Sequence, residues 1–411
     1  MRACGCIITA RRDVPFVTIV DVIMEQTEKR CVIMKKYHKL VIVLLSAIVL
    51  FNAISFWTGF SSFYRLHIFK PISAIVSHFT ALFSFAVGEI CMYIAMLMLV
   101  LGIVLGLCGV FFKKGHPFRQ MLKKYYRIEI IIALCTLLVY TFMWSVPLRA
   151  AKISFENSKE KYTLNELQTL RNYILEQMEE CAKTVPRNDN REIVYDIDLT
   201  AETQAAVNKL SNEYHLFSGY QPPIKKAMCS DFLDWMGIAG YTYPFSMEMT
   251  YNKYVTRFEF PVLYSHELAH HNGYYRENEA EFLGILAMIQ SDNAILRYSG
   301  YYAAYYWIDR AFCESLTSNY SLVEATVLYR EQPQPSKLLC DDELRNRQEY
   351  EEKYKEEVNH VLADSVKSYA EDVAETGWDI QSDFMGEAYY DGVVKLLLDY
   401  YAEIFSKGQS I

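Results

Sequence analysis

The second half of the chain contains the pattern His-Glu-x-x-His, formed by His266, Glu267 and His270. Residues four positions apart lie on the same face of an α-helix, so the two imidazoles can bind one metal ion together. Zn2+ is the metal that this spacing favours. Zinc lowers the pKa of a bound water molecule towards about 7, and the adjacent Glu267 is placed to accept a proton from that water. The pattern therefore predicts metal-assisted hydrolysis.

A catalytic zinc ion takes three protein ligands and keeps one open position, so a third ligand must come from elsewhere in the chain. Gly273 can adopt a positive φ and end the first helix, and a second helix is expected to begin near Arg276. Glu277 and Glu281 share one face of that second helix, whereas Glu279 points elsewhere. We expect Glu277 to bind the metal and Glu281 to orient a ligand histidine, with Glu279 as the alternative ligand.

The surroundings of the pattern favour a metal site over a chance occurrence. A mostly apolar run at 258–264 precedes it, and a glycine turn and an acidic helix follow it. His-Glu-x-x-His alone also arises in unrelated chains, so the prediction depends on this context. His271 projects about 100° away from His270 on a helix, and we expect it to be a neighbour of the site rather than a ligand.

Three long apolar runs occupy the first part of the chain, at 40–60, 85–112 and 130–146. Each approaches the roughly 20 residues that an α-helix needs to cross a bilayer. Their length and near absence of charge argue against buried helices of a soluble protein. We expect an α-helical membrane anchor of three transmembrane helices at 39–149, followed by a mainly α, α+β domain at 150–411.

The distribution of positive charge predicts how the spans are oriented. One basic cluster precedes the first span and another separates the second from the third, whereas the loop between the first and second carries only Arg65 and Lys70. Because basic residues accumulate on the cytoplasmic side, residues 1–38 are expected to form a cytoplasmic tail. Three crossings then leave 150–411 outside the cytoplasm, in a multi-pass protein of the cell membrane whose partner is the lipid bilayer. The two clusters consist of Arg30, Lys35, Lys36, Lys39 and of Lys113, Lys114, Arg119, Lys123, Lys124, Arg127.

The N-terminus, the cysteines and the net charge each exclude a class of feature. Residues 1–33 lack the apolar core and cleavage site of a signal peptide, and Met34 looks like a natural start, so the residues before it are an upstream extension or part of the tail. Four of the ten cysteines, Cys181, Cys229, Cys313 and Cys340, belong to the C-terminal domain; they could pair, but their spacings are wide and fit no metal motif, so the sequence predicts no particular disulfide. A net charge of -8 argues against nucleic acid as a partner.

Residues 236–252 are aromatic and broken by glycine and proline, a composition typical of short strands and turns. An exposed strand edge in this stretch can pair with an extended peptide. Ordinary packing of a strand beside the His-Glu-x-x-His helix explains the same pattern, so the sequence leaves both interpretations open.

Four stretches stand out beside the apolar runs: Phe-Ser-Phe-Ala-Val-Gly-Glu at 83–89, Met-Gly-Ile-Ala-Gly-Tyr-Thr-Tyr-Pro-Phe at 236–245, His-Glu-Leu-Ala-His with Arg-Glu-Asn-Glu-Ala-Glu at 266–281, and Tyr-Asp-Gly-Val-Val at 390–394. With these stretches, the chain from about Lys35 onward resembles the bacterial membrane proteins grouped as domain of unknown function 3810. The resemblance implies a zincin-like metallopeptidase domain and no assigned substrate.

The order Arg-Glu-x-x-Ala-acid at 276–281 is also similar to that of membrane zinc peptidases of the gluzincin kind. This similarity implies that Glu277 is the third zinc ligand and that Glu281 supports a ligand without touching the metal. The chain departs from those peptidases in carrying Glu281 where aspartate is usual. The departure affects the geometry expected of Glu281 more than the ligand role of Glu277.

Together these observations predict a membrane-anchored zinc metallopeptidase that hydrolyses a peptide or protein substrate, with Glu267 as general base. The alternative is a non-catalytic zinc-binding membrane sensor or scaffold with a zincin fold. The intact Glu267 argues against it, since a structural zinc site needs no general base and fills its fourth position. We further expect Tyr390 to donate to the substrate carbonyl oxygen, with His215 as a weaker candidate. A tyrosine packed only by its ring is the competing interpretation. The sequence does not predict the oligomeric state.

Overall fold

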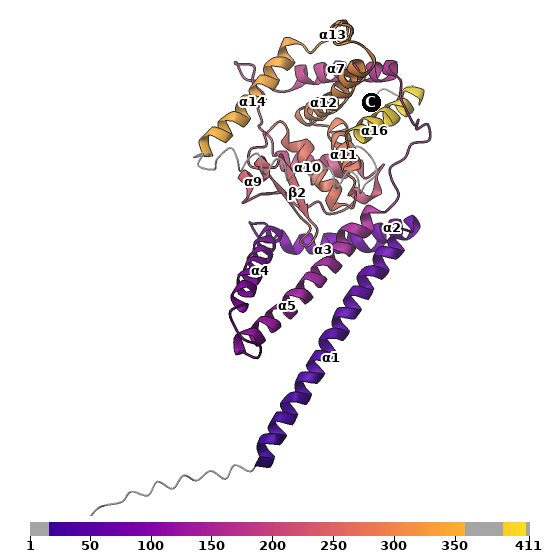
Figure 1. The fold of residues 1–411 in the computed structure, drawn as a ribbon. Helices are drawn as coiled ribbons and strands as arrows, with labels where there is room; N and C mark the ends of the chain where they lie inside the picture. Colours follow the sequence, from indigo (N-terminus) through magenta and orange to yellow (C-terminus); the bar gives the residue numbers. More distant parts are fainter. Residues whose placement is uncertain (1–15, 358–388, 408–411) are drawn as a thin grey trace, which may run out of the picture. The chain divides into compact units, whose positions relative to one another are not determined.

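The computed structural model describes the backbone of residues 16–357 and 389–407, and the side chains of 35–353 and 392–407. The described chain is mainly α-helical and contains a small β-sheet (Figure 1), which agrees with the predicted mainly helical class. Contacts divide the chain into two compact units. One is Met1–Leu50 with Val100–Leu138, and the other, called here the second unit, is Phe51–Leu99 with Val139–Ile411.

Three helical stretches are long and apolar enough to cross a membrane: Lys35–Ser55, Val87–Gly109 and Pro117–Leu148. They confirm the three apolar helices predicted from the sequence. The third is longer than its apolar run, because the polar turns that follow Pro117 are helical as well. The helices concerned are α1 (Phe16–Ser55), α4 (Val87–Gly109), α5 (Pro117–Tyr140), the π-helix η2 (Thr141–Ser145) and α6 (Val146–Leu148).

The connection between the first two apolar helices is itself helical. It consists of α2 (Thr58–Tyr64), the π-helix η1 (Arg65–Phe69) and α3 (Lys70–Thr80). Pro71 stands in the first turn of α3, directly after the π-helix η1, where the regular α-helical hydrogen bonding is already interrupted. From the sequence, only a loop with two basic residues was expected here, whereas the structure has helices with a regular inner and outer face.

The C-terminal part of the chain, which begins at residue 150, is built mostly of helices. Their bounds are α7 (Leu164–Thr184), α8 (Leu199–Leu210), the 3-10 helix η3 (His215–Phe217), α9 (Ser230–Trp235), α10 (Phe260–His271), α11 (Glu277–Ile289), α12 (Ala294–Asn319), α13 (Leu322–Arg330), α14 (Lys337–Glu357) and α16 (Tyr389–Lys407). Buried residues of α7, α8, α10, α11, α12 and α16 form the main hydrophobic core.

Helix α11 lies at the centre of this core, and nearly all of its side chains are buried. It packs against α10 on one side and against α12 and α16 on others. Gly284 permits the close approach of α10, because a Cβ at this position would lie 3.0 Å from the backbone nitrogen of His266 and 3.2 Å from Ser265 Oγ. The spacing of α10 and α11 is therefore set by backbone contact, which leaves the side chains that project between them in defined positions.

A three-stranded sheet covers α10. Its order is β1 (Lys225–Lys226), β3 (Glu248–Tyr251), β2 (Gly240–Tyr243), with β1 parallel and β2 antiparallel to β3. Both β2 and β3 fall in the stretch 236–252, for which short strands were predicted. Since β2 pairs with β3 on one side only, its other side is an edge of the described sheet.

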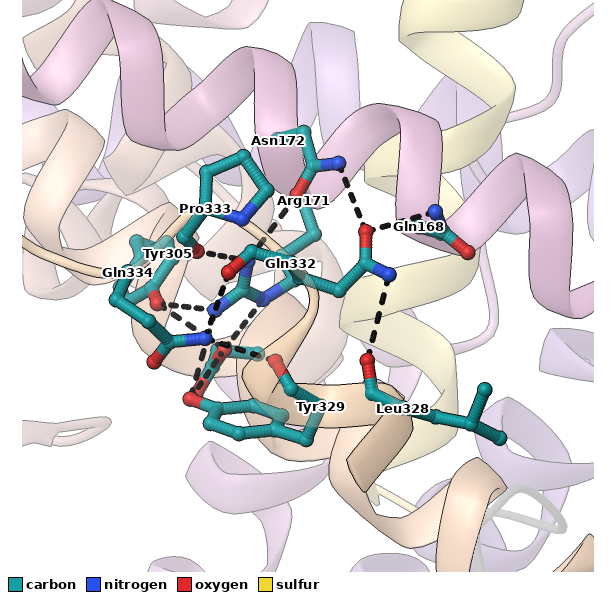
Figure 2. A network of polar contacts seen from close by, with 10 residues as sticks. Gln168, Arg171, Asn172, Tyr305, Leu328, Tyr329, Gln332, Pro333 and Gln334 are labelled. Atoms are coloured by element: carbon teal, nitrogen blue, oxygen red, sulfur yellow. Dashed lines mark hydrogen bonds and ion pairs between the residues drawn. The ribbon is translucent and has the colours of Figure 1, made fainter. Parts of the chain in front are cut away.

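A buried arginine joins α7 to α12 and α13. The Arg171 side chain is fully buried and donates to Asp309 Oδ1 at 2.6 Å, Tyr305 Oη at 2.8 Å and the carbonyl oxygen of Pro333 at 2.8 Å. Figure 2 shows the guanidinium enclosed by these partners and by Tyr329, whose hydroxyl donates to Asp309 Oδ2 at 3.0 Å. The positive charge is thus matched by groups of the chain itself.

Candidate metal centre

Helix α10 carries both histidines of the pattern, and its C-terminal end turns the chain back into α11. Gly273 has φ +95° and ends α10, as predicted. Its N–H donates to the carbonyl oxygen of His270 at 2.9 Å, and the N–H of Tyr274 donates to that of Ala269 at 3.0 Å. This is the hydrogen-bond pattern of a glycine-terminated helix. The turn is short, so α11 begins at Glu277 with its first carboxylate facing back toward α10.

His266, His270 and Glu277 converge in the space between α10 and α11. Glu277 Oε2 lies 3.2 Å from His266 Nε2 and 3.3 Å from His270 Nε2. One ligand atom of each residue lies within 4.8 Å of the other two, so the three residues could hold a metal ion. Their side chains are 11%, 5% and 15% exposed, which places the cluster inside the protein but within reach of solvent.

The opposite nitrogen of each histidine is fixed by an acceptor. His266 Nδ1 lies 2.9 Å from Glu281 Oε2, and His270 Nδ1 lies 2.8 Å from the carbonyl oxygen of Tyr274. A carboxylate and a carbonyl only accept hydrogen bonds, so each Nδ1 carries the proton. In the neutral rings each Nε2 then presents a lone pair to the Glu277 carboxylate. Three acceptor atoms converge on one point, an arrangement that requires a cation or protons between them.

The charges in the cluster also show that positive charge is needed between the three residues. Burial alone would lower the pKa of the His266 imidazole, but the Glu277 and Glu281 carboxylates outweigh it, so this pKa lies well above its ordinary value. Burial would raise the pKa of the Glu277 carboxyl, but His270 and His266 outweigh burial and hold it well below its ordinary range. The site therefore favours an ionised carboxylate and positive charge beside it.

Glu267 is held apart from the three converging residues by the sheet. Thr242 Oγ1 on β2 donates to Glu267 Oε2 at 2.6 Å, and the carboxylate is buried. Gly240 makes room for it, because a Cβ there would lie 2.7 Å from Glu267 Oε1. Burial raises the pKa of the Glu267 carboxyl above its ordinary value, and the nearby His270 and His266 oppose that rise. A carboxylate of raised pKa next to a cation site is suited to accept and return a proton.

A comparison with protein-family models places the chain. The model described as "Protein of unknown function (DUF3810)" matches residues 64–398, which is well over half of the chain and includes α10 and α11. The chain belongs to this family. Neither the curated proteins nor the solved structures yielded a match. Membership in the DUF3810 family thus confirms the resemblance seen in the sequence, and the chemistry of the site has to be argued from its residues.

Two residues near the cluster are turned away from it. Glu279, the alternative ligand, is buried on the other side of α11, where its Oε1 accepts from the backbone N–H of Ile153 at 2.9 Å. His271 is buried against α3, where Ser73 Oγ donates to its carbonyl oxygen at 3.0 Å. Burial, reinforced by Lys70, lowers the pKa of His271 to about 3, so this ring is neutral. Of the acidic candidates, the structure brings Glu277 and Glu281 to the histidines.

Of the two proposed carbonyl donors, the structure describes the side chain of His215 and not that of Tyr390. Tyr390 lies in the first turn of α16, and its side chain is outside the described residues, so its role stays a prediction. His215 is exposed on η3. Tyr241, on β2 next to Thr242, was not singled out from the sequence. Desolvation raises the pKa of Tyr241 to about 12, and Tyr140, Glu267 and Glu277 add to the rise.

Three further residues support the site and were missed in the sequence. Thr242 positions Glu267, and the stretch that contains it was recognised only as strand-forming. Trp307 Nε1, on α12, donates to Glu281 Oε1 at 2.9 Å. Tyr275 stacks on His270 with ring centroids 6.0 Å apart, and its buried hydroxyl has no hydrogen-bond partner in the described structure. The contacts of Thr242 and Trp307 join segments that are far apart in the sequence. The contact of Tyr275 depends on how the chain turns after Gly273.

Proposed function

We propose that this member of the DUF3810 family is a membrane-anchored, zinc-dependent metallopeptidase with a zincin-like domain. The observation that carries the proposal is the convergence of His266 Nε2, His270 Nε2 and Glu277 Oε2, with both Nδ1 atoms engaged elsewhere. Two imidazoles and one carboxylate are a donor set of catalytic zinc sites, which keep a fourth position open. Zinc would be held by these three residues, with Glu281 and Tyr274 orienting the histidine rings.

When bound, zinc would polarise the scissile carbonyl and make a water molecule acidic enough to react near neutral pH. Glu267 would act on that water. Its carboxylate accepts one proton as the water oxygen forms a bond to the carbonyl carbon, and it returns this proton to the amide nitrogen as the C–N bond breaks. Thr242 keeps the carboxylate in place during both transfers. The raised pKa of Glu267 favours the protonated state between them.

The edge of β2 supports a peptide as the substrate. Its residues Gly240 and Thr242 touch the Glu267 side chain, so an extended peptide paired with the outer side of β2 would run beside the proposed general base. Main-chain hydrogen bonds to a strand edge bind extended peptides with little regard to sequence. Such binding is useful to a peptidase. A zinc site that only stabilises the fold has no need of it.

We also propose that three crossings place the C-terminal part of the chain outside the cytoplasm. The second unit takes in Ser55, Val87 and Leu148, which are one end of each of the three apolar stretches, together with the metal centre. The basic clusters before the first stretch and between the second and third belong to the opposite ends. A reporter fused after Ile411 should therefore be active only outside the cytoplasm. Labelling of the C-terminus from the cytoplasm would contradict this orientation.

The test of the proposed metal is the zinc content of purified full-length protein. Wild type should retain zinc, Glu277→Gln should lose most of it, and Glu279→Gln should keep it. The two variants are matched, since both replace a glutamate in the first turn of α11 by its neutral isostere. Zinc retention by Glu277→Gln, or loss only in Glu279→Gln, would overturn the ligand set. The full chain is needed because α3 packs against the turn that follows His270.

Peptide hydrolysis is tested separately, with a diverse peptide pool and the same preparations. Cleavage by wild type and not by Glu277→Gln would support the peptidase. A zinc-loaded wild type that cleaves nothing, in membranes as well as in detergent, would favour the non-catalytic sensor or scaffold.

A further inference from the structure

The segment that connects α1 to α4 has an inner face fixed to the C-terminal part of the chain. Lys70 Nζ donates to Asn272 Oδ1, immediately after the metal-binding helix α10. On the next turn of α3, Ser73 Oγ donates to the carbonyl oxygen of His271 at 3.0 Å. At the end of α3, Thr80 Oγ1 donates to the carbonyl oxygen of Ser246 at 3.1 Å. The residues buried along this face are Ser61, Tyr64, Phe69, Ser73, Ser77 and Thr80.

The outer face of the same segment is a continuous apolar stripe. It consists of large apolar side chains that no other part of the described chain covers. They follow one another at alternating spacings of four and three residues, along one side of η1, α3 and the turn after α3. Ile75 is 70% exposed and Leu82 is 78% exposed. The stripe residues are Ile68, Ile72, Ile75, Phe79 and Leu82. The exposed aromatic residues Phe56, Trp57 and Phe63 precede them.

The two charged residues of the segment face inward. Between Phe56 and Ala86 the sequence contains no acidic residue, and its only lysine or arginine residues are Arg65 and Lys70. Arg65 lies over the Tyr274 ring at 5.1 Å, and Lys70 reaches Asn272. Exposing a contiguous apolar surface of this size to water is unfavourable, and soluble proteins rarely do so. The outer face therefore requires an apolar partner.

The chain itself indicates which partner that is. The segment begins one residue after the first apolar stretch ends at Ser55, and it finishes where the second begins at Val87. If those helices cross a bilayer, both ends of the segment are fixed at the same membrane surface. The 11 residues of α3 are about 16 Å long, too short to cross the hydrocarbon core. An amphipathic helix so placed lies in the plane of the surface, with its apolar face in the boundary between headgroups and acyl chains.

We propose that residues 56–85 form a membrane-surface segment, with the stripe embedded in the lipid and the inner face bound to the turn that follows α10. The segment thereby fixes the C-terminal end of α10 beside the membrane surface. Exposed aromatic rings such as Trp57 and Phe79 suit this boundary, because such rings gather at the interface of membrane and water. The proposal concerns lipid contact and does not depend on whether the metal centre is a peptidase.

The experiment uses the full chain in cell membranes, with the photocrosslinking residue p-benzoylphenylalanine at single positions. Ile75 and Leu82 are the test positions. Val323 on α13 is the matched control, since it is apolar, 75% exposed and part of the same second unit, at the end opposite to α3 (Figure 1). After irradiation, the intact mass of the purified protein reports what each position touches.

At Ile75 and Leu82 we expect a mass increase of one phospholipid, and at Val323 we expect none. Using two test positions guards against one substitution disturbing the fold. A cross-link to a second copy of the chain or to another protein at both test positions, without a lipid adduct, would overturn the proposal. Equal lipid adducts at Val323, or no adduct at either test position, would overturn it as well.

Discussion

Two buried polar clusters in the C-terminal part of the chain differ in how their hydrogen bonds are matched. Around Arg171, a donor-rich guanidinium meets a carboxylate, a carbonyl and a tyrosine hydroxyl, and the positive charge belongs to the chain. At the metal centre, two imidazole nitrogens and a carboxylate oxygen converge within 4.8 Å, and all three are acceptors in the neutral-histidine state. The first cluster is complete without a ligand, whereas the second becomes complete only when a cation or protons are added.

This difference separates a scaffold from a site. A buried network whose donors and acceptors are all paired stiffens the helices that it joins, here α7, α12 and α13. A network of converging acceptors costs stability unless something binds there, and it is retained where binding is useful. The two clusters should therefore respond differently to substitution, the first in stability and the second in metal binding and turnover.

The largest expected effect is on turnover, from Glu267→Gln. Glutamine keeps the size of the side chain and its contact with Thr242 but cannot accept a proton from water. The variant should fold, retain zinc and lose hydrolysis by about 10²–10⁴-fold. Measurement requires one cleavable substrate or one cellular phenotype, together with zinc content.

His266→Ala is the companion variant, because it should lose both zinc and activity. If Glu267→Gln behaves as wild type while His266→Ala fails, the metal is structural. The sensor or scaffold would then replace the peptidase.

The next effect is on stability, from Arg171→Met. Removing the guanidinium leaves the partly buried Asp309 carboxylate without its positive partner and with only the Tyr305 and Tyr329 hydroxyls donating to it, which should lower the free energy of unfolding by about 3 kcal/mol. Zinc content of the folded fraction should not change. Thermal unfolding of the solubilised full chain, followed by circular dichroism, measures the first effect.

Arg310→Met is the matched control, since Arg310 is on the same helix and its ion pair with Glu314 is exposed. It should cost well under 1 kcal/mol, as exposed ion pairs do. The double variant Arg171→Met/Asp309→Leu should recover part of the loss, because no unpaired charge remains. A single Arg171→Met variant as stable as the control would remove Arg171 from the scaffold.

The part of the candidate site that is formed by residues close together in the sequence could be predicted. His266, His270, Glu277 and Glu281 fall within sixteen residues, and helix periodicity decides which of them face one another. The choice between Glu277 and Glu279 depended on where α11 begins. A single residue of difference would rotate each side chain by about 100°, so only the structure shows which carboxylate faces the histidines.

The supporting contacts lay beyond sequence reasoning. Thr242 reaches Glu267 across 25 residues and Trp307 reaches Glu281 across 26, and no periodicity links such positions. The helices of 58–80 were not predicted from the sequence, in which serines and threonines interrupt the apolar residues. Those small polar residues are what its inner face uses against the C-terminal part of the chain, a pattern that has meaning only once the partner surface is known.

A smaller effect on metal affinity is expected from Glu281→Gln. The carboxylate of Glu281 accepts from His266 Nδ1, and a glutamine keeps the shape but weakens the polarisation of the ring. Zinc affinity should fall by about 10–100-fold, as it does when a carboxylate behind a ligand histidine is changed. Competition with a chelator of known affinity measures it. Glu279→Gln, on the same helix and turned away, should match wild type, and equal losses in both variants would indicate a general effect on α11.

The smallest effect is expected from Trp307→Phe, which keeps an aromatic ring on α12 and removes the indole N–H. Glu281 Oε1 then loses its donor at 2.9 Å, while Oε2 keeps its contact with His266 Nδ1. The lost hydrogen bond is worth about 1 kcal/mol, so zinc affinity should fall roughly fivefold. The decisive measurement is the same substitution in the Glu281→Gln background. If Trp307 acts through the Glu281 carboxylate, Trp307→Phe should change affinity there by much less than in wild type. An undiminished loss would mean that Trp307 supports the site by packing, and that the hydrogen-bonded chain from α12 to the metal centre ends at Glu281.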